Sequence, residues 1–152
     1  MDALENLVAQ QEIRDLSAKY AMFLDDHDWD ALAQLWTEYA VWSIGDIVFD
    51  GREAVMGFLS GCLTEDYFAK HINGQSLIEV NEDGVTATGK TDVLWLAQNF
   101  ETQVMARYVD TYVKVDGRWM FSRREEVGID YRPGPVSSGP MVRPPASRQA
   151  AQ

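Results

Sequence analysis

The stretch Lys70-His71-Ile72-Asn73 opens a run, His71 to Val80, in which the side chains alternate as they do along a β-strand. His71 is one of only 2 histidines in the chain. A second stretch, Tyr20 to Asp25, ends the first predicted helix with a carboxylate. The first candidates for a functional site are therefore a histidine that begins a strand and an aspartate that ends a helix.

The overall composition limits the class of protein. With 152 residues, of which 46% are hydrophobic and 11% aromatic, the chain suits one globular domain with a sizeable core. Its formal net charge of -11 argues against nucleic acid or an anionic membrane surface as a partner. No stretch approaches the roughly 18 apolar residues of a membrane span, and the first residues form no basic, apolar leader. We expect a soluble cytoplasmic protein with a small-molecule substrate.

Three helices are predicted in the N-terminal part of the chain. Residues 4 to 25 place Ile13, Leu16 and Tyr20 on one face, in the i, i+3, i+7 rhythm of an amphipathic helix. Asp28 is a predicted N-cap for a second helix over about residues 29 to 37. Residues 51 to 63 are predicted to form the third.

Strands dominate the rest of the chain. Two short strands, residues 41–44 and 47–49, are predicted to pair, and four long ones follow: residues 71–80, 85–97, 102–115 and 118–129. Asn81 to Gly84 and Asp116-Gly117 are predicted hairpin turns. This order predicts an α+β fold with a strongly curved, mixed or antiparallel sheet. Residues 1–131 would form the domain, and residues 132–152, which hold all 5 prolines, an extended tail.

One motif is misleading. Residues 84 to 91 match the phosphate-loop pattern G-x-x-x-x-G-K-[ST] in every letter. That loop requires a preceding strand and a following helix N-terminus, so that backbone amides converge on phosphate. Here the residues after Gly84 alternate as a strand and a hairpin turn precedes them. We therefore do not predict a nucleotide-binding site.

His71 has two interpretations on the residues alone. It can be a satisfied histidine on a strand. It can also be a general base, if a carboxylate holds one ring nitrogen, fixes the tautomer and stabilises the imidazolium. Asp25 can supply that carboxylate, or it can be a solvated charge beside Asp26 and Asp28. His27 lies in the same polar corner and is expected to be exposed.

Further polar candidates lie on the first helix and the last strand. Tyr20 is predicted to point its hydroxyl inward, to satisfy a core polar group or to hydrogen-bond a substrate. Of Arg123 and Arg124, alternation sends one inward, where it needs a partner. Asp110 and Glu125 are candidate structural partners.

Aromatic side chains could form the walls of a pocket for an apolar ring, although each is also a candidate core residue. They are Trp42, Phe49, Trp95, Phe100 and Tyr108. Cys62, beside Phe58 and Leu59, is expected to be a small buried hydrophobe. A single cysteine excludes an intramolecular disulfide and a cysteine-cluster metal site. We expect no metal and no cofactor.

Short motifs along the chain resemble one family. They are Ile13-Arg14-Asp15-Leu16 before Asp25, Asp28-Trp29-Asp30-Ala31-Leu32, Gly51-Arg52-Glu53-Ala54, His71, Asp110-Thr111-Tyr112 and Asp116-Gly117-Arg118-Trp119-Met120-Phe121. Their order, over about residues 4 to 131, resembles the SnoaL-like branch of the nuclear-transport-factor-2-like superfamily. The resemblance implies a cone-shaped α+β barrel, in which three N-terminal helices and a curved sheet surround a cavity. It also implies a homo-oligomer, a trimer or a dimer.

Three kinds of enzyme in this family inform the site. Scytalone dehydratases match at Asp25 and His71, and bile-acid dehydratases match at Tyr20. Hexachlorocyclohexane dehydrochlorinases match the same Asp–His pair and have an active-site arginine that corresponds to Arg124. The match is incomplete, because the dehydrochlorinases have a lysine in place of Tyr20 and scytalone dehydratases use a second histidine near the place of Trp95.

The resemblance implies a cofactor-independent lyase, either a dehydratase or a dehydrohalogenase. In this interpretation Asp25 orients His71 as the general base, while Tyr20 and Arg124 stabilise the leaving group or an enolate oxygen. Tyr20 favours the dehydratase. Two alternatives keep the fold: a ketosteroid-isomerase-like or polyketide-cyclase-like enzyme, and a non-catalytic ligand-binding or accessory subunit.

Overall fold

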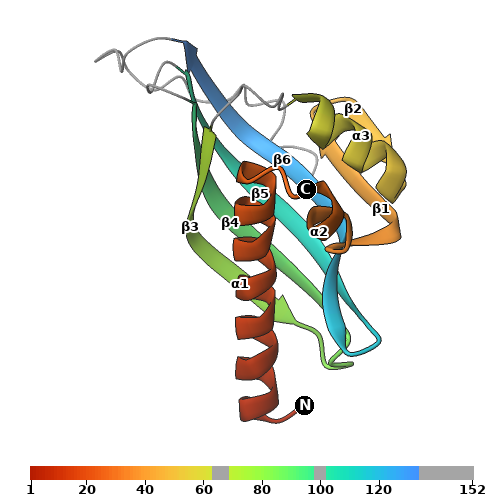
Figure 1. Ribbon diagram of the computed structural model, residues 1–152. Coiled ribbons are helices and arrows are strands. Elements are labelled where there is room, and N and C mark those ends of the chain that lie inside the picture. Colours follow the sequence, from red (N-terminus) through yellow and green to blue (C-terminus); the bar gives the residue numbers. More distant parts are fainter. Residues whose placement is uncertain (63–68, 98–101, 134–152) are drawn as a thin grey trace.

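A long helix lies across one face of a curved sheet in the computed structural model of the protein (Figure 1). The structure describes residues 1–62, 69–97 and 102–133. Its elements are α1 (Ala3–Asp25), α2 (Trp29–Ala33), β1 (Trp36–Ile44), β2 (Ile47–Asp50), α3 (Arg52–Cys62), β3 (Ala69–Val80), β4 (Thr86–Ala97), β5 (Thr102–Val115) and β6 (Arg118–Pro133). None of the described helices is long and apolar enough to cross a membrane.

The six strands form one mixed sheet. Their order is β2-β1-β6-β5-β4-β3, with β1 parallel to β6 and every other neighbouring pair antiparallel. Asp116 and Gly117 both have positive φ, as a two-residue hairpin between β5 and β6 requires. The predicted α+β class with a strongly curved mixed sheet is confirmed. The predicted tail lies outside the described residues from residue 134 onward, and so does the last residue of the predicted third helix.

A β-bulge in β3 sets which side chains face the helix. Asn73 pairs with Val93 and Ser76 pairs with Thr91, so β3 holds one extra residue at this point. Before the bulge His71 and Asn73 point to the α1 side, while Ile72 is 50% exposed on the other. After the bulge the inward positions shift by one, and Ile78 is buried. The bulge therefore allows polar side chains before it, His71 and Asn73, and an apolar side chain after it, Ile78, to face the same side of the sheet.

The second helix is shorter than predicted. The side chain of Asp28 accepts a hydrogen bond from the amide of Ala31 at 3.1 Å, which confirms the predicted N-cap. The helix ends at Ala33, however, and Trp36 already pairs with Phe121 of β6. The predicted extension to residue 37 is wrong, because pairing with a distant strand outweighs the local helical pattern.

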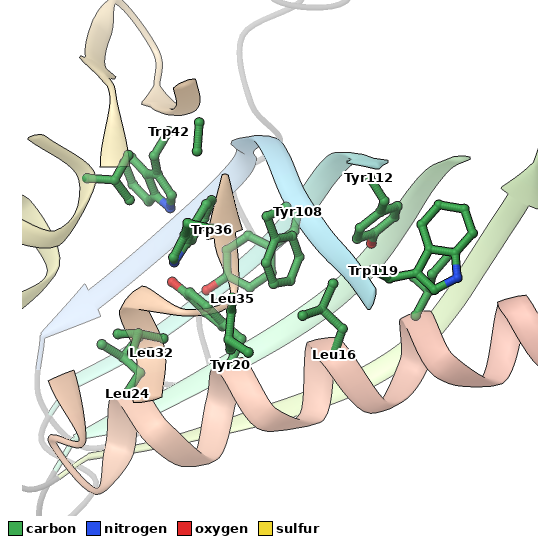
Figure 2. Packing of buried hydrophobic residues seen from close by; sticks show 14 of the residues in the cluster. Leu16, Tyr20, Leu24, Leu32, Leu35, Trp36, Trp42, Tyr108, Tyr112 and Trp119 are labelled. Carbon is green, nitrogen blue, oxygen red and sulfur yellow. The ribbon is translucent and has the colours of Figure 1, made fainter. Parts of the chain in front are cut away.

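Aromatic rings fill the space between α1 and the sheet. Tyr20 points up from the helix into this layer (Figure 2). Its ring makes edge-to-face contacts with Trp36, Tyr108 and Phe121 at centroid distances of 5.9, 6.0 and 5.8 Å. Such contacts stabilise beyond the area that they bury. Tyr20 is 2% exposed.

The rejected phosphate-loop motif has a structural explanation. Its residues lie in the turn before β4 and in β4 itself, and the strand continues to Ala97, so the motif is followed directly by strand and not by a helix N-terminus. A Cβ on Gly89 would lie 2.9 Å from Cε2 of Tyr112 and 3.2 Å from the carbonyl oxygen of Leu77. Gly89 is therefore present because the buried ring of Tyr112 packs against its backbone.

We predict that Gly89→Ala destabilises the protein by about 1–3 kcal/mol, because Tyr112 cannot move away without leaving its buried site. Urea denaturation measures this change. Gly57→Ala is the matched control, since nothing lies within 4 Å of a Cβ at this helical position. The control should be stabilised by about 0.5–1 kcal/mol. Equal effects of the two substitutions would contradict the packing explanation.

Candidate active site

A cavity of about 270 Å³ lies between α1, α3 and the inner face of the sheet. Its walls are mainly apolar, from Leu24, Trp42, Ile44, Phe58, Leu59, Val93, Trp95, Val104, Ala106 and Tyr108. A few polar groups interrupt these walls, namely Tyr20, Cys62, His71 and Glu126. An apolar pocket with a small number of convergent polar groups is typical of a small-molecule site.

Asp25 and His71 meet at the edge of this cavity. Oδ1 of Asp25 lies 2.6 Å from Nδ1 of His71, and the two side chains are only 4% and 8% exposed. The backbone amide of His71 also donates to the same carboxylate, at 3.2 and 3.0 Å. Because a carboxylate only accepts, Nδ1 carries the proton and Nε2 is left as an acceptor. This is the arrangement that a histidine base needs.

Asp25 occupies an electrostatically poor position. It is the last residue of α1, where the helix dipole disfavours negative charge, and α1 has no basic residue in its last turn. His71 and Lys70 compensate from β3, with Nζ of Lys70 3.7 Å from the carboxylate. Asn73 adds a second tie, donating to the carbonyl oxygen of Ser17 at 3.0 Å. The end of α1 and the start of β3 are therefore held together by the carboxylate of Asp25 and by the hydrogen bond of Asn73.

We predict that ¹⁵N NMR of the neutral imidazole shows His71 protonated at Nδ1 and bare at Nε2. Asp25→Ala removes the acceptor, so the preference for the Nδ1–H tautomer should disappear. His27 provides an internal control, because its ring stacks on Trp29. An Nε2–H tautomer of His71 in the wild-type protein would contradict the assignment.

Arg124 is the inward arginine of β6, and Asp110 is its partner. Nε and Nη2 of Arg124 donate to the two oxygens of Asp110 at 2.8 Å each. The guanidinium carbon also lies 4.3, 3.9 and 4.3 Å from the ring centres of Tyr20, Tyr108 and Phe121. Bidentate pairing and three ring faces compensate for burying the cation.

The pair affects the acid–base properties around it. Burial lowers the pKa of Arg124, but Asp110 more than offsets this and the pKa lies above its ordinary value. Burial raises the pKa of Tyr20 to about 12, against the opposing charge of Arg124. The pKa of Tyr108 is also raised, chiefly by burial. Both phenols that line the cavity therefore stay protonated and can act as hydrogen-bond donors.

The predicted wall residues divide into two groups. Trp42, Trp95 and Tyr108 line the cavity, and the buried indole nitrogen of Trp42 has no hydrogen-bond partner among the described residues. Phe49 lies behind this wall, stacked on Phe58 with ring centroids 4.2 Å apart. Phe100 lies outside the described residues.

Two expectations about single residues need correction. Cys62 is exposed rather than buried, because it is the last residue of α3 and sits at the rim of the cavity. His27 is half-buried rather than exposed, because its ring stacks on Trp29 at a centroid distance of 5.1 Å.

Glu126 is a charged cavity residue that the sequence interpretation missed. It lies two residues after Arg124 on β6 and so shares the inner face of that strand. Burial raises the pKa of Glu126 to about 6, with the Arg124 charge opposing the shift. The alternation that sends Arg124 inward was the available signal.

We predict that Glu126 makes the protein less stable as the pH rises. Its pKa is about 6 in the folded protein and 4.5 ordinarily, so the folded state binds the proton more tightly. This contribution, about 2 kcal/mol, is full below pH 4.5 and is lost as the pH rises through about 6. Urea denaturation at pH 4.5 and 7.5 should show the loss in the wild type and in Glu125→Gln. A loss of the same size in Glu126→Gln would contradict the assignment.

A larger hollow, of about 450 Å³, lies between α1 and the turn that joins β5 to β6. It is lined partly by charged groups such as Glu12, Asp15, Lys19 and Arg118. Lys114 already pairs with Glu12 there, at 3.2 Å. The smaller cavity is the better candidate site, because it joins apolar walls to the Asp25–His71 contact. In the part of the chain that the structure describes, no cluster of three or more His, Cys, Asp or Glu side chains could hold a metal ion.

The curved sheet, the long helix across it and the apolar pocket between them define a cone-shaped α+β domain of the nuclear-transport-factor-2-like superfamily. The chain belongs to the SnoaL-like domain family, which matches residues 5–125.

Known proteins of this family place lyases among its members. The chain is 29% identical over 131 residues to the gamma-hexachlorocyclohexane dehydrochlorinase of Sphingobium indicum, covering 82% of this chain and 83% of that enzyme. A protein from Novosphingobium aromaticivorans, provisionally described as a scytalone dehydratase, has 26% identity and a TM-score of 0.78, over 90% and 94% of the two chains. A type 2 hexachlorocyclohexane dehydrochlorinase shares the fold, with 24% identity and a TM-score of 0.76 over 95% and 99% of the chains.

Proposed function

We propose that this protein is a cofactor-independent lyase in which His71, oriented by Asp25, removes a proton from carbon. The observation that carries the proposal is the 2.6 Å contact between Asp25 and Nδ1 of His71 at the edge of an apolar cavity. A carboxylate on one ring nitrogen stabilises the imidazolium that forms when the other nitrogen takes the proton. The similarity to a dehydrochlorinase supports the same reaction class.

The rest of the cavity suits the second half of an elimination. The phenol of Tyr20 stays neutral and can donate a hydrogen bond to an enolate or leaving-group oxygen. Arg124 lies directly behind Tyr20 and Tyr108, and its cation stabilises negative charge on that side of the cavity. Nη1 of Arg124 has no hydrogen-bond partner among the described residues. We assign these residues to the stabilisation of charge that develops as the leaving group departs.

The cavity volume and walls indicate the substrate class. About 270 Å³ between rings such as Trp42 and Trp95 suits a compact molecule with an apolar ring. We propose a substrate with a hydroxyl or halide on the carbon next to an acidic C–H. Assembly as a homo-oligomer stays a prediction, and exposed apolar side chains on the outer face of β3, Ile72 and Leu77, are compatible with it.

The proton-removal step can be tested without a leaving group. Cyclohexanone in D₂O reports removal of a carbon-bound proton as deuterium exchange, which NMR measures. We predict that His71→Gln and Asp25→Asn reduce catalysed exchange by about 10²- to 10⁴-fold. The matched controls His27→Gln and Asp26→Asn should leave it unchanged.

Product analysis then identifies the reaction. Cyclohexanones with a 3-hydroxy or 3-chloro group both give 2-cyclohexenone on elimination, whereas an isomerase or cyclase conserves mass. Catalysed exchange that survives in both His71→Gln and Asp25→Asn would exclude the mechanism. A protein that binds cyclohexanone without catalysing exchange would be the non-catalytic binding subunit.

A further inference from the structure

Glu126 lines the cavity but has no role in the proposed removal of a proton by His71. Among the described residues its side chain makes no hydrogen bond and no salt bridge, although it lines the same cavity as His71. The nearest cation, Arg124, is engaged on two of its nitrogens by Asp110. A carboxyl group in an apolar wall, with no hydrogen bond to any of the described residues, leaves its oxygens for a ligand.

The position of Glu126 complements that of His71. Glu126 comes from β6 and His71 from β3, and strands β5 and β4 lie between them in the sheet. The two side chains therefore enter the cavity from different sides, leaving the space between them for the ligand. Acid–base groups on either side of one ligand are the arrangement that an elimination with a poor leaving group requires.

We propose that Glu126 is the proton donor to a departing hydroxyl group, so that the cavity is built for dehydration rather than for loss of halide. The proposal rests on the proposed function of His71. In the step, the carbon–hydrogen bond breaks and its proton goes to Nε2 of His71. The electron pair forms the carbon–carbon double bond and the carbon–oxygen bond breaks. The oxygen takes the proton of Glu126 and leaves as water, and return of the proton from His71 to Glu126 restores both groups.

The surroundings of Glu126 favour its protonated form. The charged and titratable groups around it are Tyr20 on α1, Cys62 on α3, His71 on β3, Tyr108 on β5 and Arg124 on β6. Burial outweighs the Arg124 cation and raises the pKa of Glu126 to about 6. An acid in this range is protonated often enough to act and acidic enough to give up its proton near neutral pH. A chloride ion needs no proton, and an ionised Glu126 would repel it.

The test compares two leaving groups on one ring. We expect Glu126→Gln to reduce formation of 2-cyclohexenone from 3-hydroxycyclohexanone by about 10²-fold or more. Its formation from 3-chlorocyclohexanone should change less than threefold or increase. Glu125→Gln, on the opposite face of β6, is the matched control and should behave as the wild type.

The pH profile supplies a readout that a structural role would not move. For the hydroxy compound the wild-type rate should fall as the pH rises through the range where Glu126 ionises. Glu126→Gln should lack this fall, and Glu126→Asp should restore it with part of the rate. A Glu126→Gln variant that dehydrates within threefold of the wild type overturns the proposal. So does a wild-type protein that eliminates chloride but not water.

Two further measurements separate this proposal from the function of His71. Deuterium exchange into cyclohexanone depends on His71 and should survive Glu126→Gln. If exchange is lost in His71→Gln and kept in Glu126→Gln, His71 is the base, whether or not Glu126 is the proton donor. Carboxyl ¹³C NMR follows Glu126 directly, with Glu126→Gln to assign the signal. Cyclohexanol should move that signal and keep the group protonated to higher pH. An unchanged signal, or a preference for cyclohexylammonium over cyclohexanol, overturns the proposal.

Discussion

The buried pair between Arg124 and Asp110 fixes the geometry of the inner face of the sheet. Register places the two residues opposite each other on β6 and β5, so their fork-to-fork hydrogen bonds also align the two strands. Breaking such a pair would leave a buried charge uncompensated, at a cost of about 3–5 kcal/mol. The ring of Tyr20 then lies on the guanidinium and is held edge-on by Trp36. The position of α1, and with it one wall of the cavity, follows from this pair.

Local patterns predicted much of this architecture. The first helix was predicted from its apolar rhythm, and the hairpins from turns whose residues have the positive φ that such turns require. The end of α2 was not predictable in this way, because Trp36 is drawn into a parallel pairing with β6, more than 80 residues away in sequence, and sequence periodicity carries no information about that partner.

The inward face of β6 depends on a second irregularity. Strict alternation from the buried Phe121 would send Arg123 inward, but an extra residue between Phe121 and Arg123, opposite Tyr112 and Thr111, shifts the phase. Arg124 is therefore inward and Arg123 is exposed. Once Arg124 is placed, Glu126 follows by a two-residue step. The position of Glu126 could therefore be predicted from the sequence once the inward residue of the strand was known. The Asp25–His71 contact, across 46 residues, required family resemblance rather than spacing.

The site contains two carboxyl groups in contrasting surroundings. Asp25 accepts hydrogen bonds from a backbone amide and an imidazole, whereas Glu126 lies among apolar walls, and burial there raises its pKa. When the environments of two acidic groups differ in this way, one site can hold a proton acceptor and a proton donor at the same pH. A halide ion leaves without a proton, so under our proposal the protonated carboxyl group in this wall favours loss of water over loss of halide.

The bulge in β3 has a consequence for how such proteins diversify. Because one extra residue between Asn73 and Ser76 separates the two halves of the strand, the side chains before and after it can change faces independently. Loss of that single residue would keep Ile78 in the core while turning His71 outward and Ile72 into the cavity. A deletion of one residue would therefore replace the imidazole of His71 on the cavity wall by the apolar side chain of Ile72, while Tyr20 and Glu126 stay in place. The length of β3, and not only the identity of its residues, therefore decides which side chains reach the cavity.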